Sequence, residues 1–285
     1  DALEALGTGF LQAPGNDLSA RIADGALSVE DYHRSLLRLV YRLLFLFVTE
    51  DRGLLLDPDA DQTAVRRYHD FYATARLRAL VRKRRGARHV DQWEGLQLVI
   101  AALGQVGGQP LLGLPGLGGI FNPEPVDVVM GQHLPNEALF TAVRRLSIVH
   151  PKGSPPRVVD YRNLGAEELG SIYESLLELV PRHDRLERTF TLENLAGNDR
   201  KTSGSYYTPS SLIDLVLDEA LDPLLDERAK DSDPEQALLA MTVCDPACGS
   251  GHFLVAAARR IATRLASVRT GEADPTPADI QAAMH

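Results

Sequence analysis

The chain has 285 residues, of which 44% are hydrophobic and 24% charged, and its formal net charge is −9. This length suits one large or two ordinary domains, and the composition is that of a folded globular protein. The acidic balance excludes a uniformly basic nucleic-acid binder but allows a local basic face.

Two cysteines, Cys244 and Cys248, lie close together near the C-terminal end. They provide no disulfide framework and are too few for a structural zinc site, so we expect a reducing, cytoplasmic setting. The most apolar run, residues 36–48, contains Arg38 and Arg42 and is shorter than the ~20 residues of a membrane span, which predicts a buried core helix. No signal peptide is recognisable, and the absence of an initiator Met predicts a piece of a longer protein.

The first half of the chain predicts a mainly helical domain. Ser28 and the acids after it are typical of a helix start, and the helix should run to about Glu50. Further helices are expected at 61–85, 93–103 and 137–146. The Pro- and Gly-rich segment 150–156 is the best linker candidate. We therefore predict a helical connector domain at 1–155 and a second domain at 156–285.

A basic stretch closes the expected helix at 61–85. Seven cations lie between positions 76 and 88, with no acid between Asp70 and Asp91. One hypothesis is that this stretch contacts nucleic-acid phosphates, through Arg82, Lys83, Arg84 and Arg85. The alternative is a solvated helix end whose cations complement the C-terminal dipole. The sequence leaves both open.

The second half predicts a short strand at 158–161, a helix at 166–180 and a strand at 188–192. A helix capped by Thr208, with Pro209 at its first position, should follow, and Asp222-Pro223 should kink or end it. An apolar run at 237–243 is of strand length, and a helix should follow at 253–268. The turn between them is the most informative stretch of the chain. Asp245 stands at the carboxyl end of the expected strand, where open α/β sheets bind ligands, and the helix start can hold a carboxylate or phosphate.

The type of ligand follows from what this turn lacks and what it offers. No Gly-Lys-Ser/Thr follows the turn, which excludes a P-loop, and a third glycine at dinucleotide-fingerprint spacing is missing. An Asp beside a helix N-terminus suits a ligand that carries both an amine and a carboxylate. The methionine half of S-adenosylmethionine has both groups.

A family resemblance agrees with this chemistry. The segment 245–254, Asp-Pro-Ala-Cys-Gly-Ser-Gly-His-Phe-Leu, resembles motif I of the N6-adenine DNA methyltransferases, within a motif region at 243–254. The segment 201–209 resembles their motif X, and the order X before I is that of the gamma subgroup. The segment 169–177 is similar to type I and type IIG modification proteins. The segment 39–47 resembles the connector of single-chain restriction–modification enzymes.

The resemblance implies a helical N-terminal domain followed by the start of an α/β Rossmann-like methyltransferase domain that uses S-adenosylmethionine. It implies double-stranded DNA with an adenine target as substrate, a restriction–modification or phage-defence setting, and nuclease or specificity domains or subunits outside this chain. It also implies these cofactor-binding residues: Tyr206, Tyr207, Thr208, Pro209, Asp245, Pro246, Ala247, Gly249, Gly251 and Phe253.

The catalytic motif of the family, Asn/Asp-Pro-Pro-Tyr/Phe, has no counterpart here. Ser-Pro-Pro-Arg at 154–157 lacks the aromatic residue that stacks on a flipped base, and it precedes both cofactor motifs. We assign no catalytic residue and no metal ligand, and we expect this chain alone to be inactive. The alternatives are a helical scaffold or DNA-binding module with a vestigial cofactor site, and a methyltransferase acting on RNA or protein.

Overall fold

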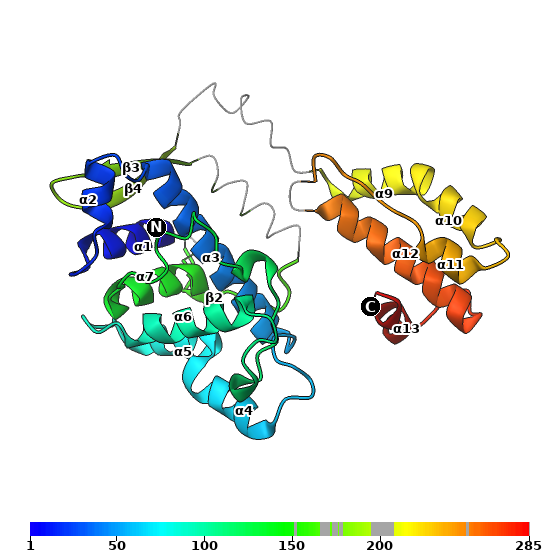
Figure 1. Ribbon diagram of the computed structural model, residues 1–285, viewed down its shortest axis with the longest axis horizontal. Coiled ribbons are helices and arrows are strands. Elements are labelled where there is room, and N and C mark those ends of the chain that lie inside the picture. Colours follow the sequence, from blue (N-terminus) through cyan, green and yellow to red (C-terminus); the bar gives the residue numbers. More distant parts are fainter. Residues whose placement is uncertain are drawn as a thin grey trace. The chain divides into compact units, whose positions relative to one another are not determined.

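A computed structural model describes residues 1–150, 153–165, 172, 176, 179–194, 208–248 and 251–284. The chain divides into two compact units, one formed by Asp1–Leu164 with Leu176–Gly197, the other by Gly165–Ser175 with Asn198–His285 (Figure 1). This division differs from the predicted boundary after residue 155, because the chain returns to the first unit in a β-hairpin.

Helices dominate the first unit. Its helices are α1 (Ala2–Gln12), α2 (Leu18–Ala23), α3 (Val29–Asp51), α4 (Gln62–Arg67), α5 (Thr74–Lys83), α6 (Asp91–Gly104) and α7 (Asn136–Ser147), with a π-helical turn η1 (Tyr68–Tyr72) and 3-10 turns η2 (Pro110–Leu112) and η3 (Gly119–Phe121). Its strands are β1 (Ile148–Val149), β2 (Arg157–Val158), β3 (Leu179–Asp184) and β4 (Thr189–Asn194).

The long helix α3 forms the centre of this unit. Its start is confirmed, since Ser28 Oγ accepts the Asp31 backbone N–H at 2.9 Å. The apolar run within it is buried, as predicted for a core helix. Arg42 is buried with it and reaches the η3 loop, where it donates to Ile120 O at 2.9 Å and to the Asp127 carboxylate at 2.8 Å. The charge is therefore paired inside the protein. No described helix is long and apolar enough to cross a membrane.

The single helix predicted at 61–85 is wrong. The chain forms α4, the π-helical turn η1 and α5, and it is interrupted at Ala73, whose backbone is extended with ψ 135°. The reason lies in α3. The Glu50 carboxylate accepts the backbone N–H groups of Thr74 and Ala75 at 2.8 and 2.6 Å, and so caps a new helix from outside.

The predicted linker at 150–156 joins two paired strands. β1 and β2 are antiparallel, with Ile148 opposite Val158. The Tyr161 hydroxyl donates to Leu146 O at 2.8 Å and fixes the chain after β2. The predicted strand near 158–161 is thus confirmed only at its start, and this segment belongs to the first unit.

The hairpin β3–β4 covers helix α1. Its antiparallel strands pair from Leu179 opposite Asn194 to Asp184 opposite Thr189. Phe190 is 1% exposed and lies against Gly7 of α1, where an added Cβ would come within 2.6 Å of its ring. The predicted strand at 188–192 is confirmed as part of β4. Of the helix predicted at 166–180, the last two residues form strand β3, and most of the rest lies outside the described residues.

The second unit is helical over its described residues. Its helices are α9 (Ser210–Ala220), α10 (Asp222–Arg228), α11 (Pro234–Leu239), α12 (His252–Thr270) and α13 (Pro277–Ala283). The predicted break at Asp222-Pro223 is confirmed, because α10 begins there with Pro at its start. The apolar core of the unit is formed by Ile213, Leu217, Leu221, Leu225, Leu238, Ala257 and Leu265.

The strand predicted at 237–243 is wrong. Its first three residues complete α11, which Asp233 caps by accepting the Gln236 N–H at 3.2 Å. No strand occurs among the described residues of this unit. Residues 240–243 therefore have no described neighbouring strand with which to form backbone hydrogen bonds. The Rossmann-like sheet is therefore not confirmed. Helix α12 is confirmed, but it packs on helices of the described unit, and its Ala258 is exposed.

Candidate functional site

The turn before α12 is built by local hydrogen bonds. Asp245 Oδ1 accepts the Ala247 N–H at 3.0 Å, and Cys248 O accepts the Gly251 N–H at 2.7 Å. Gly251 is the N-cap of α12 with φ 75° and ψ 19°, a left-handed conformation that favours glycine. The predicted tight turn into a helix is confirmed.

The start of α12 favours a negatively charged ligand group. No side chain among the described residues caps the helix, and no acid lies in its first turn. The first N–H groups of a helix lack partners within the helix and carry the positive end of its dipole. Asp245 is half-buried, and of its two carboxylate oxygens only Oδ1 accepts a hydrogen bond from a described residue. The turn therefore offers an anion-binding helix end beside a carboxylate oxygen that can take a cation.

Phe253 joins this turn to the apolar core of the second unit. Its side chain is half-buried and packs against the core cluster that contains Ile213 and Leu217 of α9. Helix α9 begins at Ser210, with Pro209 at its N-cap position and no side-chain cap. The expectation that Thr208 caps this helix is wrong by one residue, because the helix starts after the proline. Thr208 is half-buried and Pro209 exposed.

The other predicted cofactor residues divide into two groups. Pro246 and Ala247 are exposed in the turn. Tyr206, Tyr207 and Gly249 lie outside the described residues. The structure thus brings the start of α9 and the start of α12 into one unit, and the contribution of the tyrosines stays a prediction.

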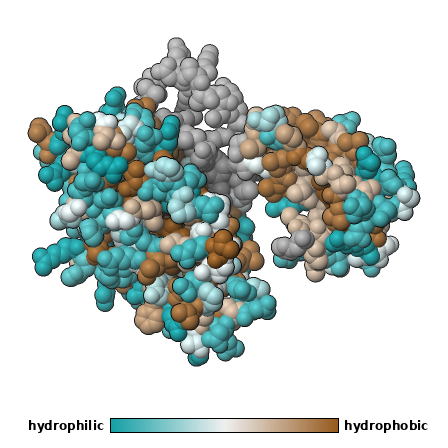
Figure 2. Space-filling model, viewed as in Figure 1, coloured by the Kyte–Doolittle hydropathy of each residue, from teal (hydrophilic) through white to brown (hydrophobic). Residues whose placement is uncertain are grey.

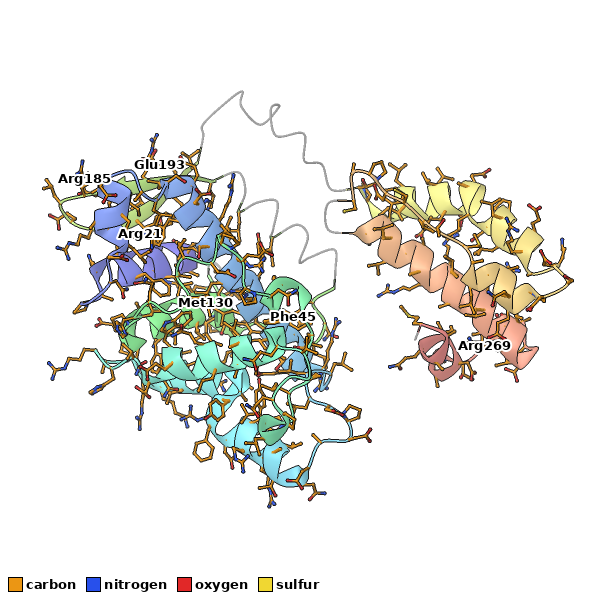
Figure 3. All side chains as sticks on the ribbon, viewed as in Figure 1. Arg21, Phe45, Met130, Arg185, Glu193 and Arg269 are labelled. Atoms are coloured by element: carbon orange, nitrogen blue, oxygen red, sulfur yellow. The ribbon has the colours of Figure 1, made fainter. Side chains whose placement is uncertain are left out.

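A ladder of ion pairs holds α12 against α9 and α10. Arg260 reaches Asp218 and Asp222 at 2.5 Å each and Asp214 at 3.2 Å. Arg269, labelled in Figure 3, binds Glu235 of α11 at 2.8 Å. Sequence reasoning missed this ladder, although acids at every fourth position of 214–222 were its signal. It fixes the direction in which the N-terminus of α12 points within the unit.

Two surface hollows of the second unit lie away from the turn. One, of about 510 Å³, is lined mainly by α12 residues that include Arg259 and Arg264. The other, of about 330 Å³, lies along α11 and includes Arg228 and Gln236. No residue of the turn lines either hollow. Cys244 and Cys248 are both exposed, and no group of His, Cys, Asp or Glu among the described residues could hold a metal ion.

The predicted basic stretch is split by the structure. Arg76 donates to the Gln92 side chain, and Arg78 forms a two-point ion pair with Asp51 of α3. These two arginines are internal ties of the first unit. The later cations are exposed, and they are Arg82, Lys83, Arg84, Arg85 and Arg88.

One family comparison bears on this chain. Residues 187–274 match the family model of N-6 DNA methylases. The matched range begins in the turn between β3 and β4, contains α9 to α12 and ends just after α12. It encloses the turn with Asp245 and Gly251. Over this range, less than half of the chain, the sequence is similar to N-6 DNA methylases. No solved structure matches the chain significantly.

Proposed function

We propose that this chain carries the cofactor-binding start of an S-adenosylmethionine-dependent methyltransferase that transfers a methyl group to adenine N6 in DNA. The observation that carries the proposal is the position of the Asp245 turn inside the range that matches N-6 DNA methylases. The turn also has the chemistry that a methionine moiety needs. The N-terminus of α12, which no described side chain caps, suits the carboxylate, and Asp245 suits the ammonium group.

The finer assignment rests on motif order and on the helical first unit. The segment 201–209 precedes the turn, as in the gamma subgroup, and a helical unit precedes both. We propose a type IIG or related restriction–modification or phage-defence protein. The segment 201–209 would close over the cofactor through Tyr206 and Tyr207. Pro246, Ala247, Gly249 and Phe253 would complete the cofactor site around the turn.

The surface of the second unit supports further packing at this site. Four apolar side chains of α9 and α10 are exposed, namely Leu212, Leu215, Val216 and Leu224, and hydrophobic residues show on the visible face of this unit (Figure 2). Val243, just before the turn, is 46% exposed. Exposed apolar patches mark surfaces that another structure covers. A sheet of a methyltransferase domain would cover them.

Calorimetry tests the cofactor site. We expect S-adenosylmethionine to bind to the purified chain and the Asp245→Ala variant to bind at least about tenfold more weakly, since it loses a charge-assisted contact. Asp274→Ala is the matched control, because Asp274 is an exposed acid just after α12. Equal losses in both variants, or no binding at millimolar cofactor, would contradict a donor site here and favour the scaffold with a vestigial site.

The chemistry of transfer is a separate test. The 285 residues contain no Asn/Asp-Pro-Pro-Tyr/Phe motif. We therefore propose that the acceptor adenine is held by sequence outside them and that this chain does not methylate DNA by itself. Incubation of duplex DNA with the chain and methyl-labelled S-adenosylmethionine should give no labelled DNA. Labelled N6-methyladenine in that assay would overturn the proposed division of the site.

A further inference from the structure

The segment between α5 and α6 carries a cluster of cations that form no ion pairs with the described residues. Arg82, Lys83, Arg84, Arg85 and Arg88 are exposed, and none forms an ion pair or a side-chain hydrogen bond with another described residue. Some exposed arginines elsewhere in the first unit are paired, for example Arg34 with Asp31 at 3.0 Å. Such a cluster is unusual in a chain with net charge −9, and in Figure 1 it lies at the outer edge of its unit.

The cations are not needed to stabilise the end of α5. Contacts from Arg144 of α7, two of them partly buried, already do so. The Arg144 guanidinium donates to Val81 O through Nε at 3.0 Å and through Nη2 at 2.7 Å, and to Arg84 O at 2.5 Å. The Val81 and Arg84 carbonyls at the end of α5 are thus satisfied, and the helix dipole has a complementary charge. This argues against the solvated helix end that the sequence left open.

The backbone that carries the cations is held at both ends. Arg144 fixes it at positions 81 and 84. Further along, Ala87 O and His89 O accept the N–H groups of Glu137 and Asn136 at 3.1 and 2.7 Å, which caps the start of α7. A loop held in this way presents its side chains from a rigid frame, so little ordering entropy is lost on binding.

Gly86 makes this frame possible. Its φ is +89°, and an added Cβ would lie 2.6 Å from Asn136 O. A side chain there would be both strained and in collision with the start of α7. The positive potential around the loop also reaches its neighbours. Burial, with Arg85 and Arg145 nearby, lowers the pKa of Arg144.

We propose that residues 82–88 form a pre-organised surface that binds the phosphate backbone of double-stranded DNA. The choice of DNA rests on the proposed function, and the surface itself rests on the loop geometry. Arginine and lysine side chains on a rigid frame supply contacts that do not depend on base sequence. The surface would hold the duplex while the second unit provides the methyl donor.

Fluorescence anisotropy with a labelled duplex tests the charges. The variant Arg82→Gln/Lys83→Gln/Arg84→Gln/Arg85→Gln should bind the duplex at least about tenfold more weakly at ~100 mM salt. The plot of log binding constant against log salt concentration should also become less steep, by the equivalent of about three to four phosphate contacts. The control variant Arg34→Gln/Arg182→Gln/Arg185→Gln/Arg188→Gln removes the same number of exposed cations elsewhere. It should change affinity less than about threefold. Equal losses, or no loss in the loop variant, would overturn the proposal.

Two charge-conserving variants test the pre-organised frame. Gly86→Ala and Arg144→Lys keep every loop cation, and we expect each to weaken duplex binding about threefold or more, with circular dichroism confirming the fold. Unchanged affinity in both folded variants would refute the frame. Binding to single-stranded DNA or RNA tenfold tighter than to duplex would refute the DNA duplex as ligand.

Calorimetry with S-adenosylmethionine on the same proteins separates this inference from the proposed function. The loop variant should retain cofactor binding. If the loop variant binds duplex DNA as tightly as the unmodified chain while cofactor binding is intact, only the proposed DNA-binding surface is overturned. We expect Asp245→Ala to lose cofactor binding whether or not the loop cations are present. If none of the proteins binds the cofactor, only the proposed donor site is overturned.

Discussion

The carboxylate of Glu50, near the end of α3, accepts hydrogen bonds from both the backbone N–H and the hydroxyl of Thr74, each at 2.8 Å. The same carboxylate accepts the Tyr68 hydroxyl at 2.6 Å and the Ala75 N–H at 2.6 Å. One side chain therefore ends the π-helical turn, starts α5 and ties both to the central helix. Thr74 and Tyr68 are buried, so their donors depend on Glu50.

We expect Glu50→Gln to reduce the free energy of unfolding by about 2–3 kcal/mol, because hydrogen bonds to a charged acceptor are lost and an amide N–H₂ group faces donors. Thr74→Ala removes one of the four donors and should cost about 1 kcal/mol. Urea denaturation measures both. The double variant provides the check: additive effects would show that the two residues do not interact in the way the geometry indicates.

The Arg42–Asp127 pair predicts a larger effect. The side chains are 1% and 6% exposed, so Asp127→Ala leaves a buried guanidinium without its counter-charge. We expect a loss of about 3–5 kcal/mol in urea denaturation. The exposed pair Arg34–Asp31 is the control, and Arg34→Ala should cost less than about 1 kcal/mol. Similar losses in the two variants would mean that Asp127 does not compensate the buried charge.

Local patterns predicted the elements whose stabilising groups lie nearby in the sequence. The start of α3 at Ser28, the break at Asp222-Pro223 and the left-handed turn at Gly251 all depend on residues within a few positions. The break at Ala73 was not predictable in this way, because its cause, Glu50, lies more than twenty residues upstream and acts through tertiary contact.

The failed strand at 237–243 has a different cause. An apolar run of that length suits a buried strand or a helix, and only a neighbouring strand decides between them. Within the described second unit no such neighbour exists, and the Asp233 cap favours α11. In the candidate site, glycine and aspartate marked the turn, whereas the Arg260 ladder that orients α12 needed the three-dimensional packing of α9, α10 and α12.

Two histidines predict how stability depends on pH. Burial lowers the pKa of both His33 and His183, and the Nε2 atom of each is buried without a hydrogen-bond partner among the described residues. Glu30 opposes the shift at His33; at His183 Asp184 opposes it and Arg185 adds to it. A lowered pKa means that the folded state binds fewer protons than the unfolded chain as pH falls below about 6.5.

Stability should therefore decrease from pH 7.5 to 5.5, with His33 contributing at most about 1.4 kcal/mol per pH unit. The measurement is urea denaturation across this range, with His33→Phe as the test variant, since His33 packs against Phe190 at a ring distance of 5.9 Å. The variant should show a shallower pH dependence. If the variant has the same slope of unfolding free energy against pH, His33 is not the source of the pH dependence.

The two glycines that bound α12 offer a matched test of the donor site. Gly251 has φ 75° at the N-cap and Gly271 has φ 73° at the C-cap, and an added Cβ at either would meet no atom of a described residue within 4 Å. Each change to Ala should cost about 1–2 kcal/mol of stability, since both impose a left-handed backbone on a residue with a side chain.

Only Gly251 lies in the turn that would hold the methionine carboxylate. We expect Gly251→Ala to weaken S-adenosylmethionine binding about tenfold and Gly271→Ala to leave it within about twofold, a difference of about 1 kcal/mol in binding free energy. Equal effects of the two variants on cofactor affinity, measured by calorimetry on proteins of equal stability loss, would move the donor site away from the start of α12.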